Sequence, residues 1–200
     1  DPSAVGTRTA VVEIVSDGVG AAGYTFAVGG SGVPDMSEIL VLGTNGQAVL
    51  DGNTTVSAAA GTYFGGTAVS AGSIDRVFSI TNSGSADLVI SNVTFQGAGA
   101  AHYSAPSVPA VVVPGTQSNL LLRFSPAAAG VMTVVVVIAN NDVDENPYEF
   151  AVLGEGISTH YVWTNSPSPT PPFLTWDTAA QTIQEAANVC VSGDVIIATN

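Results

Sequence analysis

The chain has 200 residues, of which 46% are hydrophobic and 10% charged, and its 16 acidic residues, three arginines and lack of lysine give a formal net charge of −13. This composition can fill a core, which argues against disorder, and it lacks the clustered cations that nucleic acid or an anionic membrane surface requires. The single cysteine, Cys190, excludes an internal disulfide, and the longest apolar runs are strand-sized, shorter than the roughly 18 residues of a spanning helix.

Residues 1–33 repeat residues 125–157 at a constant offset of 124, without a gap. We interpret this as a tandem repeat, in which residues 1–33 are the last two strands of one Ig-like domain and residues 36–157 are a complete second copy. We therefore expect the chain to be a segment of a longer protein. The identical pairs include Val12/Val136, Ile14/Ile138, Tyr24/Tyr148, Phe26/Phe150, Gly30/Gly154 and Gly32/Gly156.

Alternating positions in the two repeated strands predict which face of each strand is buried. Positions such as Val136 and Phe150 keep their residue type in both copies, so we expect them to face a core. The intervening positions change, and Val137 stands where the first copy has Glu13, so we expect that face to meet solvent. Alternation with one buried face indicates an antiparallel sheet.

Short strand candidates follow one another through the second copy, separated by turn signals such as Pro114-Gly115. They span residues 38–42, 47–50, 74–82, 87–95, 111–113, 118–124, 133–140 and 147–153. Helical periodicity is absent here, so the pattern predicts an all-β fold, an antiparallel β-sandwich. The expected core consists of Phe78, Ile80, Leu88, Ile90, Leu120, Leu122, Phe124, Val136, Ile138, Tyr148 and Phe150.

Three stretches of the second copy carry a family resemblance: VFSITNSGSADLVISNVTF, VVPGTQSNLLLRFSPAAAGVMTVVVVIANND and ENPYEFAVLGEG. They resemble the choice-of-anchor D type of Ig-like repeat, which is related to the Ig-like domains of ciliary and centrosomal Hydin/ASPM-type proteins. The resemblance covers residues 1–157. It implies an Ig-like sandwich that acts as a spacer or binding module in very large secreted or surface proteins of bacteria, and it carries over no catalytic residue.

The C-terminal part has a different composition. A Pro-rich stretch at residues 166–172 predicts a semi-rigid linker over residues 158–176. A helix signal follows, with Asp177 or Thr178 as its cap, and SGDVIIATN then predicts a turn and a strand. The expected apolar stripe of the helix consists of Ala180, Ile183 and Ala187, with Cys190 as a further member.

This C-terminal part also carries a resemblance, over residues 158–200. The order Tyr-Val, Pro-Pro, Trp, Ala-x-x-Ile-Gln-x-Ala and Gly-Asp resembles the start of a right-handed parallel β-helix in bacterial surface or polysaccharide-active proteins. There a short helix caps the stack of coils, as we expect for residues 177–200. The resemblance implies that any catalytic or sugar-binding groove would lie beyond Asn200.

An acidic turn, NNDVDEN at residues 140–146, offers the hard oxygen ligands that Ca²⁺ prefers. Asp142, Asp144 and Glu145 are therefore candidate metal ligands, although their spacing does not match an EF-hand. The first copy has Gly18 where the second has Asp142, so the fold does not need the acids, and a solvated turn explains them as well. A second acidic loop, at residues 51–54, is either a cation site or an ordinary turn.

Other reactive residues do not combine into a recognisable site. His102 and His160 are far apart and have no Cys or His partner in the sequence, so we expect no zinc site. Cys190 is expected to pack as a small apolar residue. For Trp163 and Trp176, packing at a domain junction competes with a sugar-stacking platform. We find no paired nucleophile and base, and therefore expect no enzyme activity.

The expected function is that of a non-enzymatic structural spacer in a large bacterial extracellular or cell-surface protein. Its partners would be neighbouring repeats or further copies of the same chain, which could assemble into fibres by strand complementation. Two alternatives remain open: an accessory module of a β-helix polysaccharide-active enzyme, and an adhesin that binds carbohydrate or protein.

Overall fold

The structure is a computed structural model that describes residues 5–15, 17, 23–32, 34–69 and 71–200. The chain forms two compact units, Asp1–Met36 and Ser37–Asn200. Within the described residues, no helix is long and apolar enough to cross a membrane.

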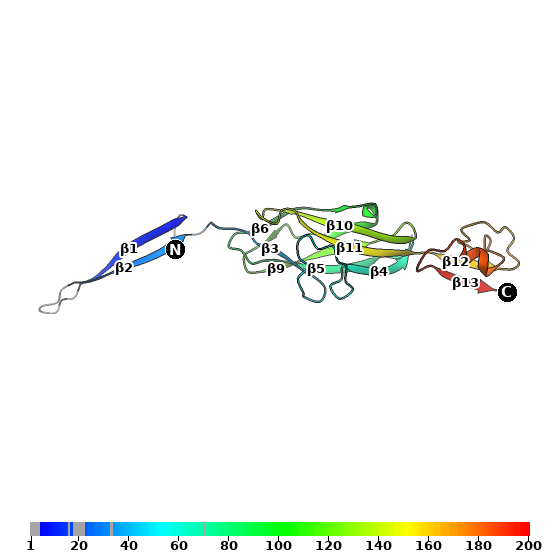
Figure 1. Cartoon of the computed structure of the whole chain (residues 1–200), viewed down its shortest axis with the longest axis horizontal. Helices are drawn as coiled ribbons and strands as arrows, with labels where there is room; N and C mark the ends of the chain where they lie inside the picture. The colour runs from blue at the N-terminus through cyan, green and yellow to red at the C-terminus, as the bar shows by residue number, and fades with distance from the viewer. Residues whose placement is uncertain (1–4, 16, 18–22, 33, 70) are drawn as a thin grey trace. The chain divides into compact units, whose positions relative to one another are not determined.

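The first unit is a β-hairpin (Figure 1). Strand β1 (Gly6–Ile14) pairs antiparallel with β2 (Tyr24–Gly32), from Gly6 opposite Gly32 to Ile14 opposite Tyr24. Every residue of these strands except Gly32 is exposed, including the apolar side chains that we expected to face a core. Residues 18–22 of the turn between the strands, where Gly18 and Gly20 stand in place of Asp142 and Asp144 of the second copy, lie outside the described residues.

The second unit is almost entirely β-structure. Its strands are β3 (Ile39–Leu42), β4 (Tyr63–Ala68), β5 (Ile74–Asn82), β6 (Leu88–Gln96), β7 (Tyr103–Ser107), β8 (Val111–Val112), β9 (Gln117–Phe124), β10 (Gly130–Asn140), β11 (Tyr148–Ile157), β12 (Thr159–Trp163) and β13 (Val195–Thr199). A 3₁₀ turn η1 (Ala100–His102) precedes β7, and a short helix α1 (Ile183–Ala187) precedes β13.

Strands β3 to β11 form a two-sheet sandwich, which confirms the all-β fold class. One sheet has the order β4-β11-β10-β6-β8 and the other β3-β5-β9-β7. Of the expected strands, only residues 47–50 are missing, because Ala48 makes a single bridge to Leu42. The prediction overlooked β4, whose Gly65 and Gly66 weaken the strand signal, and β7, which contains Pro106. It also missed that β4 runs parallel to β11.

All of the predicted core residues are buried between the two sheets. Phe78 of β5 and Phe150 of β11 bring the sheets together, with ring centroids 5.5 Å apart. The two strands missing from the prediction add Phe64 and Tyr103, whose rings meet edge to face at 5.6 Å. Such aromatic contacts add stability beyond the burial of their area.

The β10–β11 hairpin has the same register as β1–β2. Gly130 lies opposite Gly156 and Ile138 opposite Tyr148, so each pair in β1–β2 recurs 124 residues later. One prediction about the outer face is wrong: Val137 is buried rather than solvent-exposed. The reason is its central position in the sheet, since Thr94 of β6 and Glu149 of β11 flank it on the same face.

Residues 158–200 pack into a small layer of their own, so the predicted linker at 158–176 is wrong. Residues 159–163 form β12, which pairs in parallel with β13, and Val162 bridges Ala180 on its other edge. Phe173 lies in the apolar cluster under these strands, together with Val162. The composition suggested a linker because prolines interrupt regular helices. Prolines do not, however, prevent a loop from packing against other segments.

The predicted helix start and stripe are also wrong. Helix α1 begins at Ile183, because Thr182 and Glu185 form a reciprocal capping box. Ala180 forms a parallel β-bridge with Val162 of β12 and lies outside the helix. With only five residues, α1 buries Ala186 alone, while Ile183 is exposed.

Candidate functional site

The predicted acidic turn converges with a fourth carboxylate at one end of the sandwich. Asp142, Asp144 and Glu145 lie in the β10–β11 turn, and Glu38 lies just before β3. One carboxylate oxygen from each of the four residues lies within 4.8 Å of the others. Glu38 was not predicted, because it is more than 100 positions away in the sequence and only the packing of β3 beside this turn brings it close.

Asp142 holds the turn against the start of β3. It is almost fully buried, and its Oδ2 accepts a hydrogen bond of 2.7 Å from the backbone N–H of Ile39. Its own N–H donates to Oδ1 of Asn140 at 2.7 Å, and the Asn140 amide donates to the carbonyl of Glu145 at 2.9 Å. This carboxylate is therefore a structural acceptor as well as a candidate ligand.

Glu145 is the member of the cluster with a buried carboxylate oxygen, Oε2, that lacks a hydrogen-bond partner among the described residues. Burial raises the pKa of this carboxyl above its ordinary value, and the charges of Asp144, Asp142, Glu38 and Asp51 raise it further. A cation at this point would supply the missing partner, and Ca²⁺ is suited because it takes six to eight oxygen ligands from carboxylates, carbonyls and water.

The second acidic loop, at residues 51–54, is held by hydrogen bonds to β11. Oδ1 of Asp51 accepts a hydrogen bond of 2.6 Å from the N–H of Glu149, and the carbonyl of Asn53 accepts one of 2.8 Å from Ala151. The loop thus pairs with the first half of β11, on the edge that β4 pairs with farther along the strand. The structure supports the ordinary structural turn for residues 51–54.

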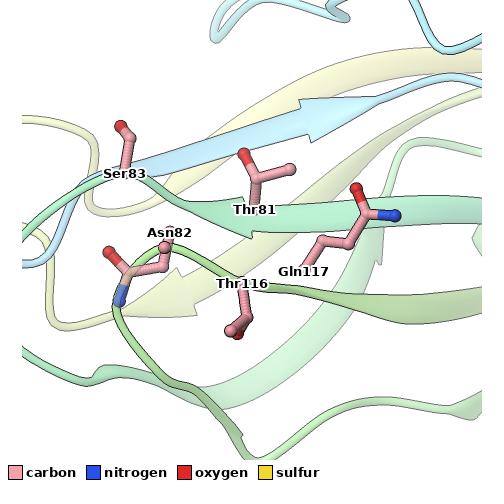
Figure 2. Close-up of a pocket in the computed structure, with 6 residues that line it drawn as sticks. Thr81, Asn82, Ser83, Thr116 and Gln117 are labelled. Carbon is pink, nitrogen blue, oxygen red and sulfur yellow. The ribbon is translucent and has the colours of Figure 1, made fainter.

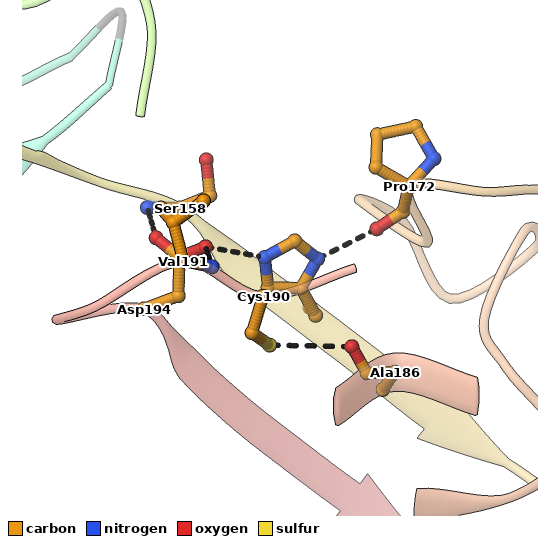
Figure 3. A network of polar contacts seen from close by, with 7 residues as sticks. Ser158, Pro172, Ala186, Cys190, Val191 and Asp194 are labelled. Atoms are coloured by element: carbon orange, nitrogen blue, oxygen red, sulfur yellow. Dashed lines mark hydrogen bonds and ion pairs between the residues drawn. The ribbon is translucent and has the colours of Figure 1, made fainter. Parts of the chain in front are cut away.

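The buried His160 forms a polar network that the sequence did not reveal, with Asp194 and Pro172, two residues labelled in Figure 3. Its Nε2 lies 2.9 Å from Oδ2 of Asp194, and its Nδ1 lies 2.6 Å from the carbonyl oxygen of Pro172. The Asp194 carboxylate also accepts hydrogen bonds from the N–H groups of Ser158 and Val191. These bonds, together with the His160 contact, hold the pKa of Asp194 low even though burial acts to raise it.

Cys190 lies beside this network, so the expectation that His160 has no cysteine partner is wrong. The Cys190 sulfur and ligand atoms of His160 and Asp194 lie within 4.8 Å of one another. However, the hydrogen bonds of both ring nitrogens of His160 go to oxygen atoms, of Asp194 and of Pro172, and not to the thiol. Burial raises the pKa of Cys190, and its thiol bonds to the carbonyl of Ala186. The arrangement suits a structural tie better than a nucleophile.

The other predicted residues lie apart from both clusters. Nδ1 of His102 accepts a hydrogen bond from the N–H of Ala127. The ring of Trp176 packs against Tyr161 at 4.6 Å and is partly exposed, which leaves the sugar-stacking alternative open.

A shallow hollow of about 360 Å³ lies where β5 ends and β9 begins (Figure 2). Thr81, Ser83, Thr116 and Gln117 line it with neutral polar groups. Asn82 also lines it, but its amide is committed to the carbonyls of Ala86 and Val112. Its lining residues thus offer hydroxyl and amide groups, but no charged side chain and no base that could activate a hydroxyl.

No family model matches the chain, and no curated protein matches it. Similar solved structures include a protein of unknown function from Porphyromonas gingivalis W83, with 15% identity, coverage of 78% of this chain and 68% of that chain, and a TM-score of 0.44. The PapD-like domain 7 of human CEP192 has 10% identity, coverage of 62% and 89%, and a TM-score of 0.40. WR4, an MSP family member of C. elegans, has 16% identity, coverage of 48% and 92%, and a TM-score of 0.33. The fold assignment rests instead on the strand pairing described above.

Proposed function

We propose that the chain is a non-enzymatic structural spacer from a bacterial extracellular or cell-surface protein, built from tandem Ig-like sandwiches. The observation that carries this proposal is where the chain enters and leaves the sandwich (Figure 1). Ile39 enters beside the β10–β11 turn, where its N–H meets Asp142. The chain leaves at Ile157, the other end of β11. Entry and exit are therefore separated by the length of that strand, as a serial spacer requires.

The strand pairing suits a module that carries tension. With ten residues at roughly 3.3 Å each, β11 spans about 33 Å. It is hydrogen-bonded to β10 on one side and to β4 on the other. Force applied at the entry and exit points would load these bonds together along the strand axis rather than one after another.

A cation at the acidic cluster would strengthen the entry end. Asp142 and Glu145 come from the turn and Glu38 from the start of β3, so one ion would join two segments that tension pulls apart. Ca²⁺ is the cation that this oxygen-rich set favours. The proposed site is Glu38, Asp142, Asp144 and Glu145.

We propose that the C-terminal layer continues as a stack of parallel strands. Strand β12 already has a parallel neighbour on both edges, namely β13 and the bridge at Ala180. Strand β13 has β12 on one edge, and a further coil would pair with its other edge. This arrangement supports the start of a β-helix.

A specific observation favours a second candidate function, carbohydrate binding as an adhesin or as an accessory module of a polysaccharide-active enzyme. The side chain of Trp176 is 39% exposed and packs on Tyr161, which gives an aromatic surface on which a sugar ring can stack. Binding of soluble polysaccharides, followed as retardation of the chain in native gels that contain the polysaccharide, tests this function. A Trp176→Ala variant should lose this retardation.

Single-molecule pulling of the chain tests the spacer function. Handles at the two chain ends load the sandwich from opposite ends of β11. The control geometry uses the N-terminal handle and a cysteine at Val143, an exposed position in the β10–β11 turn, in a Cys190→Ala background. This geometry loads one end of the sandwich and should peel strands apart at lower force. Equal or lower unfolding force with end handles would contradict the spacer function.

A further inference from the structure

The β1–β2 hairpin exposes an apolar face that its repeat buries. Phe26 is 40% exposed and Val12 is 37% exposed, whereas Phe150 and Val136, their equivalents, are 1% and 0% exposed. The strand register is the same in both hairpins, and so are the residue types on this face except at Arg8 and Ala10, where β10 has Met132 and Val134. The interface formed by β10–β11 is therefore a template for what covers β1–β2.

A glycine in this face indicates the chemistry of the covering partner. At Gly154 of β11, a Cβ atom would lie 2.6 Å from the ring of Phe124, so only glycine lets β11 approach β9. At the equivalent Gly30, a Cβ atom would have no atom of another residue within 4 Å, its two chain neighbours aside. A glycine costs strand stability relative to a larger residue when nothing packs against it. Its presence at Gly30 fits a partner that places an aromatic ring there.

We propose that β1–β2 completes a second sandwich by docking on a strand set of the β3–β9 type, with an aromatic ring against Gly30. This inference rests on the proposed function, since it requires a tandem array. The occupant is a segment of the character of residues 34–124, joined directly ahead of Asp1. In that sandwich, β1 would pair with a strand equivalent to β6 and β2 with one equivalent to β4, as β10 and β11 do here.

A second copy of this chain fits the face less well. Its sandwich already holds β10–β11 between β6 and β4, so an incoming hairpin would have to displace it. The displaced and incoming hairpins carry the same core residues, such as Phe150 and Phe26. Replacing one hairpin by the other would therefore bury little additional apolar surface. In a sandwich that lacks this hairpin, docking would bury the apolar surface of the whole interface.

The test is a fusion that places an additional copy of residues 34–124 directly before Asp1 of the full chain. At the offset of 124, Asp1 is equivalent to Ser125. Residue 124 of the added copy therefore directly precedes Asp1, as Phe124 precedes Ser125 in the second copy. Amide hydrogen exchange in β1–β2 is compared with that of the unfused chain. We expect exchange to slow by at least about 100-fold as the hairpin joins a cooperative core.

Two matched variants distinguish specific docking from general collapse. Gly30→Leu should restore fast exchange in the fusion, because its side chain meets the added Phe124 ring, and should leave the unfused chain unchanged. Gly29→Leu should be tolerated in both, because its equivalent on the outward face is already Leu153. If both variants behave alike, the proposed contact at Gly30 is wrong.

Two further results would overturn the proposal. One is a fusion in which the added segment is unfolded and the hairpin exchanges as before. The other is concentration-dependent association of the unfused chain in light scattering that Phe26→Ala abolishes, which would make a second copy the occupant. The pulling experiment loads the sandwich of residues 37–157 and does not need the hairpin, so its outcome tests the spacer function separately.

Discussion

The two copies of one hairpin differ in their surroundings more than in their residues. In β10–β11, Tyr148 is buried, and its hydroxyl donates a hydrogen bond of 2.6 Å to the carbonyl of Val49. In β1–β2, the equivalent Tyr24 is 66% exposed. Both hairpins have the same register, which the alternating residues favour, whereas burial depends on the other strands of the sandwich.

The two hairpins also differ in the sequence of their turns. The strands keep their pairing whether the turn is acidic, as at Asp142, or carries Gly18 at the same position. The acidic residues are thus an addition to the hairpin. In the second copy they tie the turn to the start of β3, through the bond from Ile39 to Asp142.

The largest expected difference between the hairpins comes from removing the shared phenylalanine. Phe150→Ala should lower the free energy of unfolding of the sandwich by about 3–5 kcal/mol, because it leaves a cavity against Phe78. Phe26→Ala should change it by less than about 0.5 kcal/mol, because that side chain packs on no closed core here. Urea denaturation of the full chain measures both. Equal costs would show that β1–β2 is buried in solution.

A smaller effect is expected from making the second turn resemble the first. Asp142→Gly should cost about 2 kcal/mol, because the buried N–H of Ile39 loses its acceptor. Asp144→Gly is the matched control at an exposed position of the same turn, and should cost much less. Thermal unfolding of the two variants gives the comparison. A negligible cost for Asp142→Gly would mean that water replaces the carboxylate.

The smallest expected effect is the pH response of Glu145, a charge that the first hairpin lacks. The folded protein raises the pKa of this carboxyl above its ordinary 4.5, so it favours the protonated form. Its contribution to stability is therefore present below pH 4.5 and is lost as pH rises through the raised pKa. Without Ca²⁺, Glu145→Gln should be slightly more stable than the parent at pH 7, by up to about 1 kcal/mol.

Addition of Ca²⁺ sharpens this prediction, because the ion and the substitution act on the same charge. Ca²⁺ should raise the unfolding temperature of the parent at pH 7 and have a reduced effect on Glu145→Gln. Mg²⁺ is a useful control, since it demands a stricter geometry. If Ca²⁺ has no effect on the parent, the acidic cluster is a solvated turn.

The C-terminal layer shows where a sequence pattern misleads. The Pro-rich composition predicted an extended linker, but Phe173 packs with Val162 in a small core. The network of His160, Asp194 and Pro172 joins residues up to 34 positions apart. Parallel pairing of β12 with β13 brings them together, and such pairing leaves no short-range signal because its crossover is long.

The sequence alone determined the fold class, most strands, the inward face of the β10–β11 hairpin and the acidic turn. It could do so because alternation, turn residues and an internal repeat are local or self-comparing signals. Only the tertiary structure decided that β4 runs parallel to β11, that Glu38 joins Asp142 and that Cys190 lies beside His160. These contacts depend on how distant segments pack, and the local sequence around each residue does not identify its partner.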